Sequence, residues 1–310
     1  MKKLPSGIFP FFIVLAATLW GLDGIILRPA LYTLPVAVVV FVEHAIAFAI
    51  MIPFLIYERK KLKTITKAGY GHFFLVALLG GALGTIFITK GLFYVHFASL
   101  SSVILVQKLQ PIFAILLAYI VLKEKLPPKF FAYTALALIG AYAVSFPNLL
   151  PNLDTGDKTA IAAFFGLLAA ICWGASTVFG KRALNETNYR VGTYLRYGLT
   201  TLIMLVIMLS TKTQSAITTM TSTQWMYVLI IIFSSGGVAM LLYYYGLKKT
   251  KASVSTICEL ALPLSAIVFE WLIRGKILTP TQFIGAAILL FSIVRVSKLK
   301  QATDKIQTAE

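Results

Sequence analysis

Two apolar segments of the chain carry amide or carboxylate side chains on the same helical face as a proline. Gln107, Gln110 and Pro111 lie at spacings i, i+3 and i+4, and Glu259 and Pro263 repeat the i, i+4 spacing 152 residues later. A proline inside a helix removes a backbone hydrogen bond and kinks the helix. The pattern therefore predicts a binding site for a polar, zwitterionic or cationic molecule. Hydrogen bonding between helices is the alternative interpretation.

Further ionisable residues lie inside apolar stretches, where each costs roughly 2.5–3.5 kcal/mol to insert and so indicates a function. Glu43 and Arg196 stand 153 residues apart. They predict either a substrate or proton site, or a structural ion pair with each other or with a neighbour. Lys108 and Lys90 could hold an anionic substrate group. The alternatives are a partner such as Glu43 for Lys108, and extension to the membrane interface for Lys90.

Two tryptophans, each followed by glycine, recur at the same offset. Trp20 and Trp173 predict aromatic walls for an amphipathic ligand, with helix packing as the alternative. The two cysteines, Cys172 and Cys258, lie in separate apolar segments and are expected to be small buried side chains. Neither a metal site nor a disulfide framework is indicated, and we expect no cofactor.

The composition requires that these residues be positioned by membrane helices. The chain has 310 residues, 59% hydrophobic and 13% charged, with a mean hydropathy of +0.86. These charges are too few to cover a soluble protein of this size, and apolar stretches of about 20 residues recur instead. We predict an all-α membrane protein with ten spans: 8–27, 34–57, 73–95, 99–122, 130–147, 160–182, 190–210, 225–247, 253–273 and 280–297. The first is interpreted as a retained span rather than a cleaved signal peptide.

The basic residues predict the orientation. The net charge of +17 is spread over alternate loops and not collected on one face, which argues against nucleic-acid binding. With a cytoplasmic N-terminus, 20 Lys and Arg residues fall in inner loops and tails and five in outer loops. The outer five are Arg28, Lys158, Lys212, Arg274 and Lys276. We therefore predict a multi-pass protein of the cell (inner) membrane with both termini in the cytoplasm.

The second half of the chain repeats the first. Leu15-Ala16-Ala17 and Trp20-Gly21 recur 153 residues later as Leu168-Ala169-Ala170 and Trp173-Gly174. Because each copy holds five spans, an odd number, the two copies must have inverted orientations, as in alternating-access transporters with a site near the midplane. The predicted division is a first five-helix repeat (8–147), a linker (148–159), a second five-helix repeat (160–298) and a cytoplasmic tail (299–310).

These features resemble a known family. The Trp-Gly pair of the first span, Ala98-Ser99 at the start of the fourth, Pro111, and Lys123-Glu124-Lys125 at its end are similar to the EamA family of the drug/metabolite transporter superfamily. The resemblance implies ten helices around a central cavity lined mainly by spans 1, 3, 4, 6, 8 and 9, and movement of small metabolites, often export. The second copy departs from the pattern, since Gly275-Lys276 stands where Glu124-Lys125 is expected.

The sequence thus favours a secondary transporter, an exporter or exchanger of a small polar or amphipathic metabolite such as an amino acid or organic cation. Glu43, Glu259 and Glu270 are the carboxylates most able to couple protons, and protons or a counter-substrate are candidate partners besides the substrate and the bilayer. An anionic or phosphorylated substrate held by Lys90, Lys108 and Arg196 is the alternative. A non-transporting sensor is less favoured, as is an intramembrane enzyme, since His, Asp and Cys are scattered. A monomer or homodimer is expected.

Overall fold

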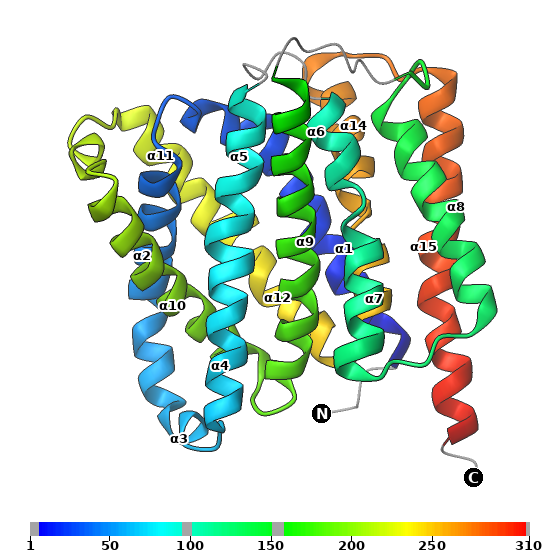
Figure 1. The fold of residues 1–310 in the computed structure, drawn as a ribbon, viewed down its shortest axis with the longest axis horizontal. Coiled ribbons are helices and arrows are strands. Elements are labelled where there is room, and N and C mark those ends of the chain that lie inside the picture. The colour runs from blue at the N-terminus through cyan, green and yellow to red at the C-terminus, as the bar shows by residue number, and fades with distance from the viewer. Residues whose placement is uncertain (1–5, 95–100, 151–157, 308–310) are drawn as a thin grey trace.

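The fold is a bundle of helices (Figure 1), seen in a computed structural model that describes residues 6–94, 101–150 and 158–307. The predicted Ala98-Ser99 start of the fourth span and most of the predicted linker lie outside these residues. The α-helices are α1 (Phe9–Leu22), α2 (Val36–Tyr57), α3 (Arg59–Leu62), α4 (Lys67–Val76), α5 (Gly84–Tyr94), α6 (Ser101–Gln107), α7 (Gln110–Leu122), α8 (Pro128–Ser145), α9 (Thr159–Leu184), α10 (Tyr189–Ser210), α11 (Ser222–Ile231), α12 (Gly237–Lys249), α13 (Ala252–Cys258), α14 (Ala261–Arg274) and α15 (Pro280–Gln307).

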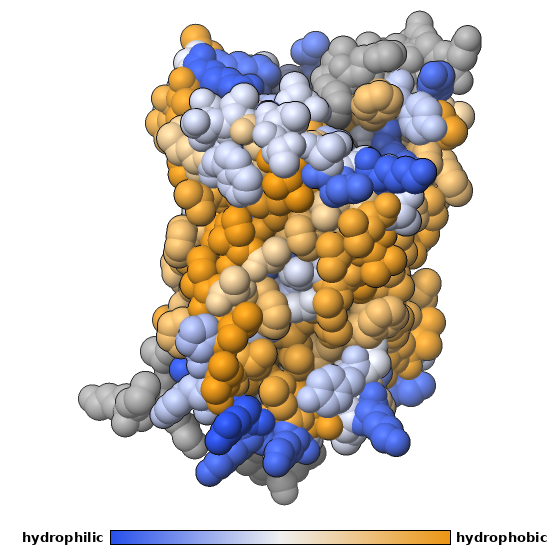
Figure 2. All heavy atoms as spheres, turned by 90° about the vertical axis from the view of Figure 1, so that its left-hand side faces the viewer, coloured by the Kyte–Doolittle hydropathy of each residue, from blue (hydrophilic) through white to orange (hydrophobic). Residues whose placement is uncertain are grey.

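Nine helical stretches in the described part of the chain are long and apolar enough to cross a membrane. They are Phe9–Leu31, Val36–Tyr57, Lys67–Tyr94, Val103–Leu122, Ala160–Leu184, Tyr189–Ser210, Ser222–Lys249, Ala252–Arg274 and Pro280–Leu299. The predicted span 130–147 forms α8, whose 18 residues include Lys129 and two tyrosines and which is not among the nine. At about 1.5 Å per residue α8 is still ~27 Å long. Figure 2 shows a broad apolar band between two polar rims on the side of α2, α10 and α11, as a bilayer requires.

The two five-helix repeats are inverted. Helix α1 begins at the face of the bundle where α15 ends, which we call the terminal face, whereas α9, the first helix of the second repeat, begins at the opposite, distal face (Figure 1). Local irregularities recur in both copies. The third span of each repeat contains a π-helical segment, at Ala77–Leu83 and Ile232–Gly236. The fourth span of each is interrupted, between α6 and α7 and between α13 and α14, just before Pro111 and Pro263.

Close approach of glycines joins the last helices of the two repeats. α8 lies along α15 at one edge of the bundle (Figure 1). A Cβ on Gly140 would lie 2.9 Å from the carbonyl oxygen of Gly285, and one on Gly285 would lie 3.0 Å from that of Gly140. Small residues at such a crossing let backbones pack where lipid provides no hydrophobic driving force. The pair stands apart from the cavity described below and completes the scaffold around it.

Glu58, at the end of α2, joins α2 to α10 at the terminal face. Its carboxylate accepts from Lys61 Nζ at 2.6 Å, from Arg190 Nε at 2.7 Å and from the Asn188 amide. Burial raises the pKa of Glu58, but the hydrogen bonds from Lys61 and Asn188 and the charge of Arg190 outweigh it, so this pKa lies below its ordinary value.

We expect Glu58→Gln to lower the thermal unfolding midpoint at pH 7, with a loss of about 1–3 kcal/mol in the free energy of unfolding. A carboxyl whose pKa is depressed by folding stabilises the protein above its unfolded pKa, and this stabilisation is lost as the pH falls through the folded pKa. The difference between parent and variant should therefore shrink below about pH 4.5, the ordinary value. Arg59→Gln, at the exposed neighbouring residue, is the control and should change neither the unfolding midpoint at pH 7 nor its dependence on pH. If the difference in midpoint between parent and Glu58→Gln stayed as large in acid, the stabilisation would not come from the ionised carboxylate.

The orientation predicted from the basic residues can be tested on opposite faces of the fold. Thr64 lies in the connection that follows α3 at the terminal face, and Gln214 follows α10 at the distal face; both are exposed. We expect a single cysteine at Thr64 to be labelled by a membrane-impermeant thiol reagent only after cells are opened, and one at Gln214 to be labelled in intact cells. The reverse pattern would invert the topology.

Candidate substrate cavity

A cavity of about 450 Å³ lies between the two repeats, within the roughly 300–1,000 Å³ typical of small-molecule sites. All six spans that the family resemblance implied (1, 3, 4, 6, 8 and 9) line it, and α2 and α10 contribute as well, whereas α8 and α15 do not. The lining reaches Tyr32 and Leu34, in the connection between the first two spans at the distal face. The part of the first span nearest the terminal face, residues 9–19, contributes nothing. The cavity thus extends toward the distal face.

The two interrupted helices place polar side chains in this cavity. Glu259 lies in the break between α13 and α14, and Gln107 and Gln110 flank the break between α6 and α7. Gln107 Nε2 donates to Gln110 Oε1 at 3.2 Å, and Gln110 Nε2 donates to Glu259 Oε2 at 2.8 Å. The three residues singled out by their spacing to proline therefore form one hydrogen-bonded chain across the two repeats.

The other oxygen of Glu259 is bound by hydroxyl groups. Tyr243 Oη donates to Glu259 Oε1 at 2.7 Å, and Thr177 Oγ1 donates to the same oxygen at 3.3 Å. The sequence predicted neither donor, and Tyr243 is buried. All three donors to this carboxylate are neutral, and Glu259 forms no salt bridge within the described residues. A buried carboxylate held in this way can bind a cationic or hydrogen-donating group, or a proton.

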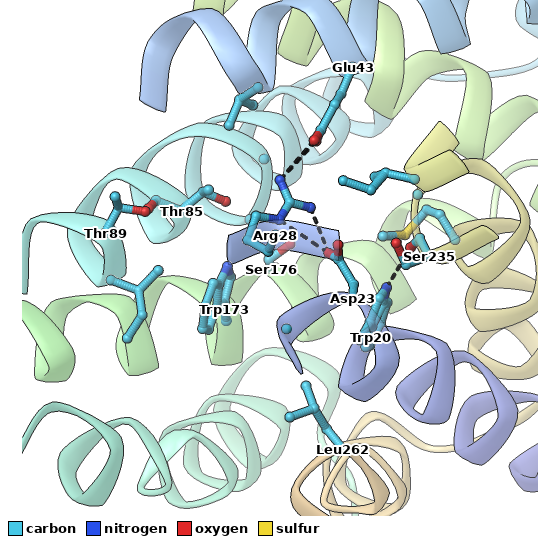
Figure 3. A pocket seen from close by; sticks show the side chains of 18 of the residues that line it. Trp20, Asp23, Arg28, Glu43, Thr85, Thr89, Trp173, Ser176, Ser235 and Leu262 are labelled. Carbon is cyan, nitrogen blue, oxygen red and sulfur yellow. Dashed lines mark hydrogen bonds and ion pairs between the residues drawn. The ribbon is translucent and has the colours of Figure 1, made fainter. Parts of the chain in front are cut away.

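Arg28 joins two carboxylates on the cavity wall (Figure 3). Its Nη2 lies 2.7 Å from Asp23 Oδ2, and its Nη1 lies 2.8 Å from Glu43 Oε1. The prediction that Arg28 is an outer-loop charge was wrong, because the first span continues beyond α1 through a π-helical segment (Asp23–Leu27) and a 3₁₀ turn (Arg28–Leu31). Of the two interpretations offered for Glu43, the structure places it in an ion pair, and the partner is Arg28 rather than Arg196.

Both predicted tryptophans line the cavity, and Figure 3 shows them on opposite sides of Arg28. Trp20 Nε1 donates to the backbone oxygen of Ser235 at 3.0 Å, and its ring centroid lies 5.3 Å from that of Tyr243. Trp173 packs against Gly84, where a Cβ would lie 2.5 Å from Trp173 Nε1. The two indoles give the cavity apolar surfaces beside its polar groups.

Two basic side chains of the lining lack an acidic partner. Lys108 stands in the break between α6 and α7, and its ammonium group makes no hydrogen bond or ion pair with the described residues. Arg196 Nη1 reaches Tyr244 Oη only at 3.5 Å, and its buried Nε has no partner there. Asp23 Oδ1 and the Ser235 hydroxyl are likewise buried without a partner. Buried polar groups are normally satisfied, so these atoms are candidates for contacts with a ligand or water.

The remaining two predicted residues lie outside the cavity lining. Lys90 is exposed on α5, with Nζ 5.8 Å from the centre of the Phe165 ring. Glu270, near the distal end of α14, pairs with Lys276 at 3.3 Å and contacts Arg274 at 4.0 Å. The described residues contain no group of three His, Cys, Asp or Glu side chains able to hold a metal ion.

Comparison with known proteins places the fold and the cavity in a family. Residues 8–146 and 160–298 each match the EamA-like transporter family. The chain belongs to the EamA-like transporter family. This EamA-like chain is therefore a membrane transporter, and its cavity between the repeats is the candidate path for a small molecule.

Individual relatives agree with this assignment. The chain is 44% identical over 288 residues, which are 93% of this chain and 96% of the relative, to the riboflavin transporter ImpX of Fusobacterium nucleatum. It is 25% identical to an uncharacterized transporter of Synechocystis, over 86% of this chain and 78% of that protein. An uncharacterized transporter of Clostridium kluyveri is 26% identical, with 87% and 85% covered.

A solved crystal structure supports the fold alone. It superposes with a TM-score of 0.71 over 95% of this chain and 97% of its own, at 16% identity. The all-helical EamA-like architecture thus recurs in a protein of very different sequence.

Proposed function

We propose that this EamA-like transporter carries a flavin, with riboflavin as its substrate. The observation that supports this most is the 44% identity, over nearly the whole of both chains, to a riboflavin transporter. The proposal replaces an amino acid or organic cation, which the sequence favoured, as the first candidate. Those substrates remain predictions, as do proton or counter-substrate coupling and a location in the cell membrane.

The chemistry of the cavity suits a flavin. Riboflavin has a flat, largely apolar ring system, one edge of which carries two carbonyls around an N–H, and a tail of hydroxyl groups. Trp20 and Trp173 offer aromatic surfaces for the ring. Lys108 and Arg196 can donate to carbonyl oxygens, and Glu259 can accept from an N–H. A cavity of about 450 Å³ that combines a few polar groups with aromatic walls is typical of sites for ligands of this kind.

A phosphorylated flavin is the second candidate, and one observation favours it. The cations of Lys108 and Arg196 line the cavity without a carboxylate partner among the described residues, whereas Arg28 is neutralised by two. Cations that form no ion pair favour an anionic group on the ligand. Flavin mononucleotide, which adds a phosphate to the riboflavin tail, is the matched ligand for testing this.

Flavin fluorescence allows both candidates to be tested on the purified protein. We expect the fluorescence of riboflavin to be quenched when riboflavin is titrated into the detergent-solubilised protein, because the bound ring stacks on tryptophan. Trp20→Ala and Trp173→Ala should each weaken binding at least about tenfold, a loss of ~1.4 kcal/mol or more. Trp271→Ala removes an exposed tryptophan of α14 and is the control.

The outcomes separate the two candidates. Tighter binding of flavin mononucleotide, lost in Lys108→Met, would make the phosphorylated form the substrate. Absence of binding by either flavin, with the protein folded, would refute the proposal. Protein reconstituted in liposomes, with riboflavin either inside or outside, then shows whether riboflavin moves down its gradient in both directions.

A further inference from the structure

A hydrogen-bonded contact joins the two repeats at the terminal face, below the cavity. Glu124 follows α7 and is only 9% exposed. Its Oε1 accepts from the backbone N–H of Ala252 at 2.7 Å, and its Oε2 accepts from the backbone N–H of Ser253 at 3.2 Å and from the Ser253 hydroxyl. These groups begin α13, whose preceding residue Lys251 provides no side-chain cap. A carboxylate at a helix N-terminus satisfies free N–H groups and interacts favourably with the helix dipole.

This contact closes the cavity on the terminal side. Directly beside it, Ala118 of α7, Val178 of α9 and Ala252 of α13 form a buried apolar cluster. α7 and α13 pack against each other there. By the repeat, the corresponding pair at the distal face is α14 and α6, and over the described residues no comparable packing joins them. Among the described residues, packing therefore closes the cavity at the terminal face, and no comparable packing closes it at the distal face.

The two repeats differ at the residue that makes this contact. α7 and α14 both end in a left-handed residue, Lys123 with φ 55° and Gly275 with φ 66°. Aligned on these left-handed residues, one position away from the correspondence used in the sequence analysis, Glu124 of the first repeat matches Lys276 of the second. Lys276 is exposed and pairs with Glu270. When an inverted-repeat transporter changes state, the contact at one face opens and its counterpart at the other forms. Here the counterpart would bring a lysine, not a carboxylate, to the N-terminus of α6, where a cation is unfavourable.

We propose that Glu124 is the positioning residue that holds the empty transporter closed at the terminal face, and that Lys276 disfavours closure at the distal face. The transporter then rests open to the distal side, and opening toward the terminal side requires the carboxylate to leave α13. The mechanism does not depend on which molecule is carried. Glu124 contacts no part of the cavity lining apart from the helix that it caps, so its effect is on the equilibrium between the two states.

Thiol reactivity behind the contact measures this equilibrium without any substrate. Cys172→Ala and Cys258→Ala remove the native thiols, and Val178→Cys, at a fully buried position of the apolar cluster, reports opening of the terminal side. We expect slow labelling in this background and labelling about tenfold faster or more after Glu124→Gln, since charge-assisted hydrogen bonds at a buried helix N-terminus are lost. Ala141→Cys, at a fully buried position of α8, is the matched reporter, and its labelling should stay slow with or without Glu124→Gln.

A second variant leaves Glu124 in place. Lys276→Glu supplies the missing carboxylate at the distal face and should also speed labelling of Val178→Cys, while Lys212→Glu, at another exposed lysine of that face, should not. Unchanged labelling of Val178→Cys in both Glu124→Gln and Lys276→Glu would overturn the proposal. Equal acceleration at Ala141→Cys would also overturn it, because Glu124 would then stabilise the fold in general. Both results are read without flavin, so they are independent of the flavin proposal.

Discussion

Glu259→Gln is expected to reduce transport at least about tenfold while the protein stays folded. The variant removes the charge that a buried carboxylate presents to a substrate or proton, and keeps the shape of the side chain. Folding should survive because the hydrogen-bonded chain can reverse. The amide introduced by Glu259→Gln would donate to Gln110 if the amides of Gln110 and Gln107 turn over, while its oxygen still accepts from Tyr243 and Thr177.

Transport into liposomes and the thermal unfolding midpoint, measured together, separate a role in binding from a role in packing. Glu186→Gln provides the control, since Glu186 is a carboxylate at the terminal face that accepts from Thr66 far from the cavity. Normal transport at every pH in a stable Glu259→Gln protein would show that Glu259 carries neither substrate nor proton. A collapse of the midpoint would assign Glu259 to packing.

The arrangement around Glu259 could be predicted because it depends on short spacings along single helices. Proline spacing placed Gln107, Gln110 and Glu259 at interruptions, and the repeat placed the interruptions opposite each other. The lengths of the apolar stretches likewise predicted the all-helical fold, and the repetition over an odd number of spans predicted the two inverted repeats. These features follow from local sequence and from the bilayer, so they need no knowledge of packing angles.

Arg28 and Tyr243 could not be placed in the same way. A basic residue at the end of an apolar stretch has the signature of a loop, and only the π-helical and 3₁₀ continuation of the first span carries Arg28 to Asp23 and Glu43. Lys90 and Glu270 lie outside the cavity lining, because the direction in which a helix presents a side chain depends on the neighbouring helices. Charge alone therefore indicated which side chains were unusual, but not which of them meet.

Arg28→Met is expected to destabilise the protein by about 3–5 kcal/mol, the range for breaking a buried ion pair on one side. The cause is the two carboxylates that remain: Asp23 and Glu43 are both buried, and both are bound by Arg28. Without the guanidinium, two buried carboxylates face each other at the cavity wall without their cation, which disfavours the ionised form of both. Glu43→Gln should cost less, because Arg28 then keeps the charge of Asp23.

Replacing the two carboxylates that Arg28 binds should restore the stability that is lost in Arg28→Met. Arg28→Met combined with Asp23→Asn and Glu43→Gln leaves neutral side chains that can bond to one another, and its unfolding midpoint should return most of the way to that of the parent. Arg182→Met, at a terminal-face arginine of α9 outside the cavity, is the control for loss of a basic side chain. A triple variant no more stable than Arg28→Met would show that the guanidinium acts by packing rather than by charge. Flavin binding measured on the restored triple variant then shows whether the ion pairs take part in recognition. Unchanged affinity would mean that these three residues only hold the first span against α2. Weakened affinity would place them in contact with the ligand.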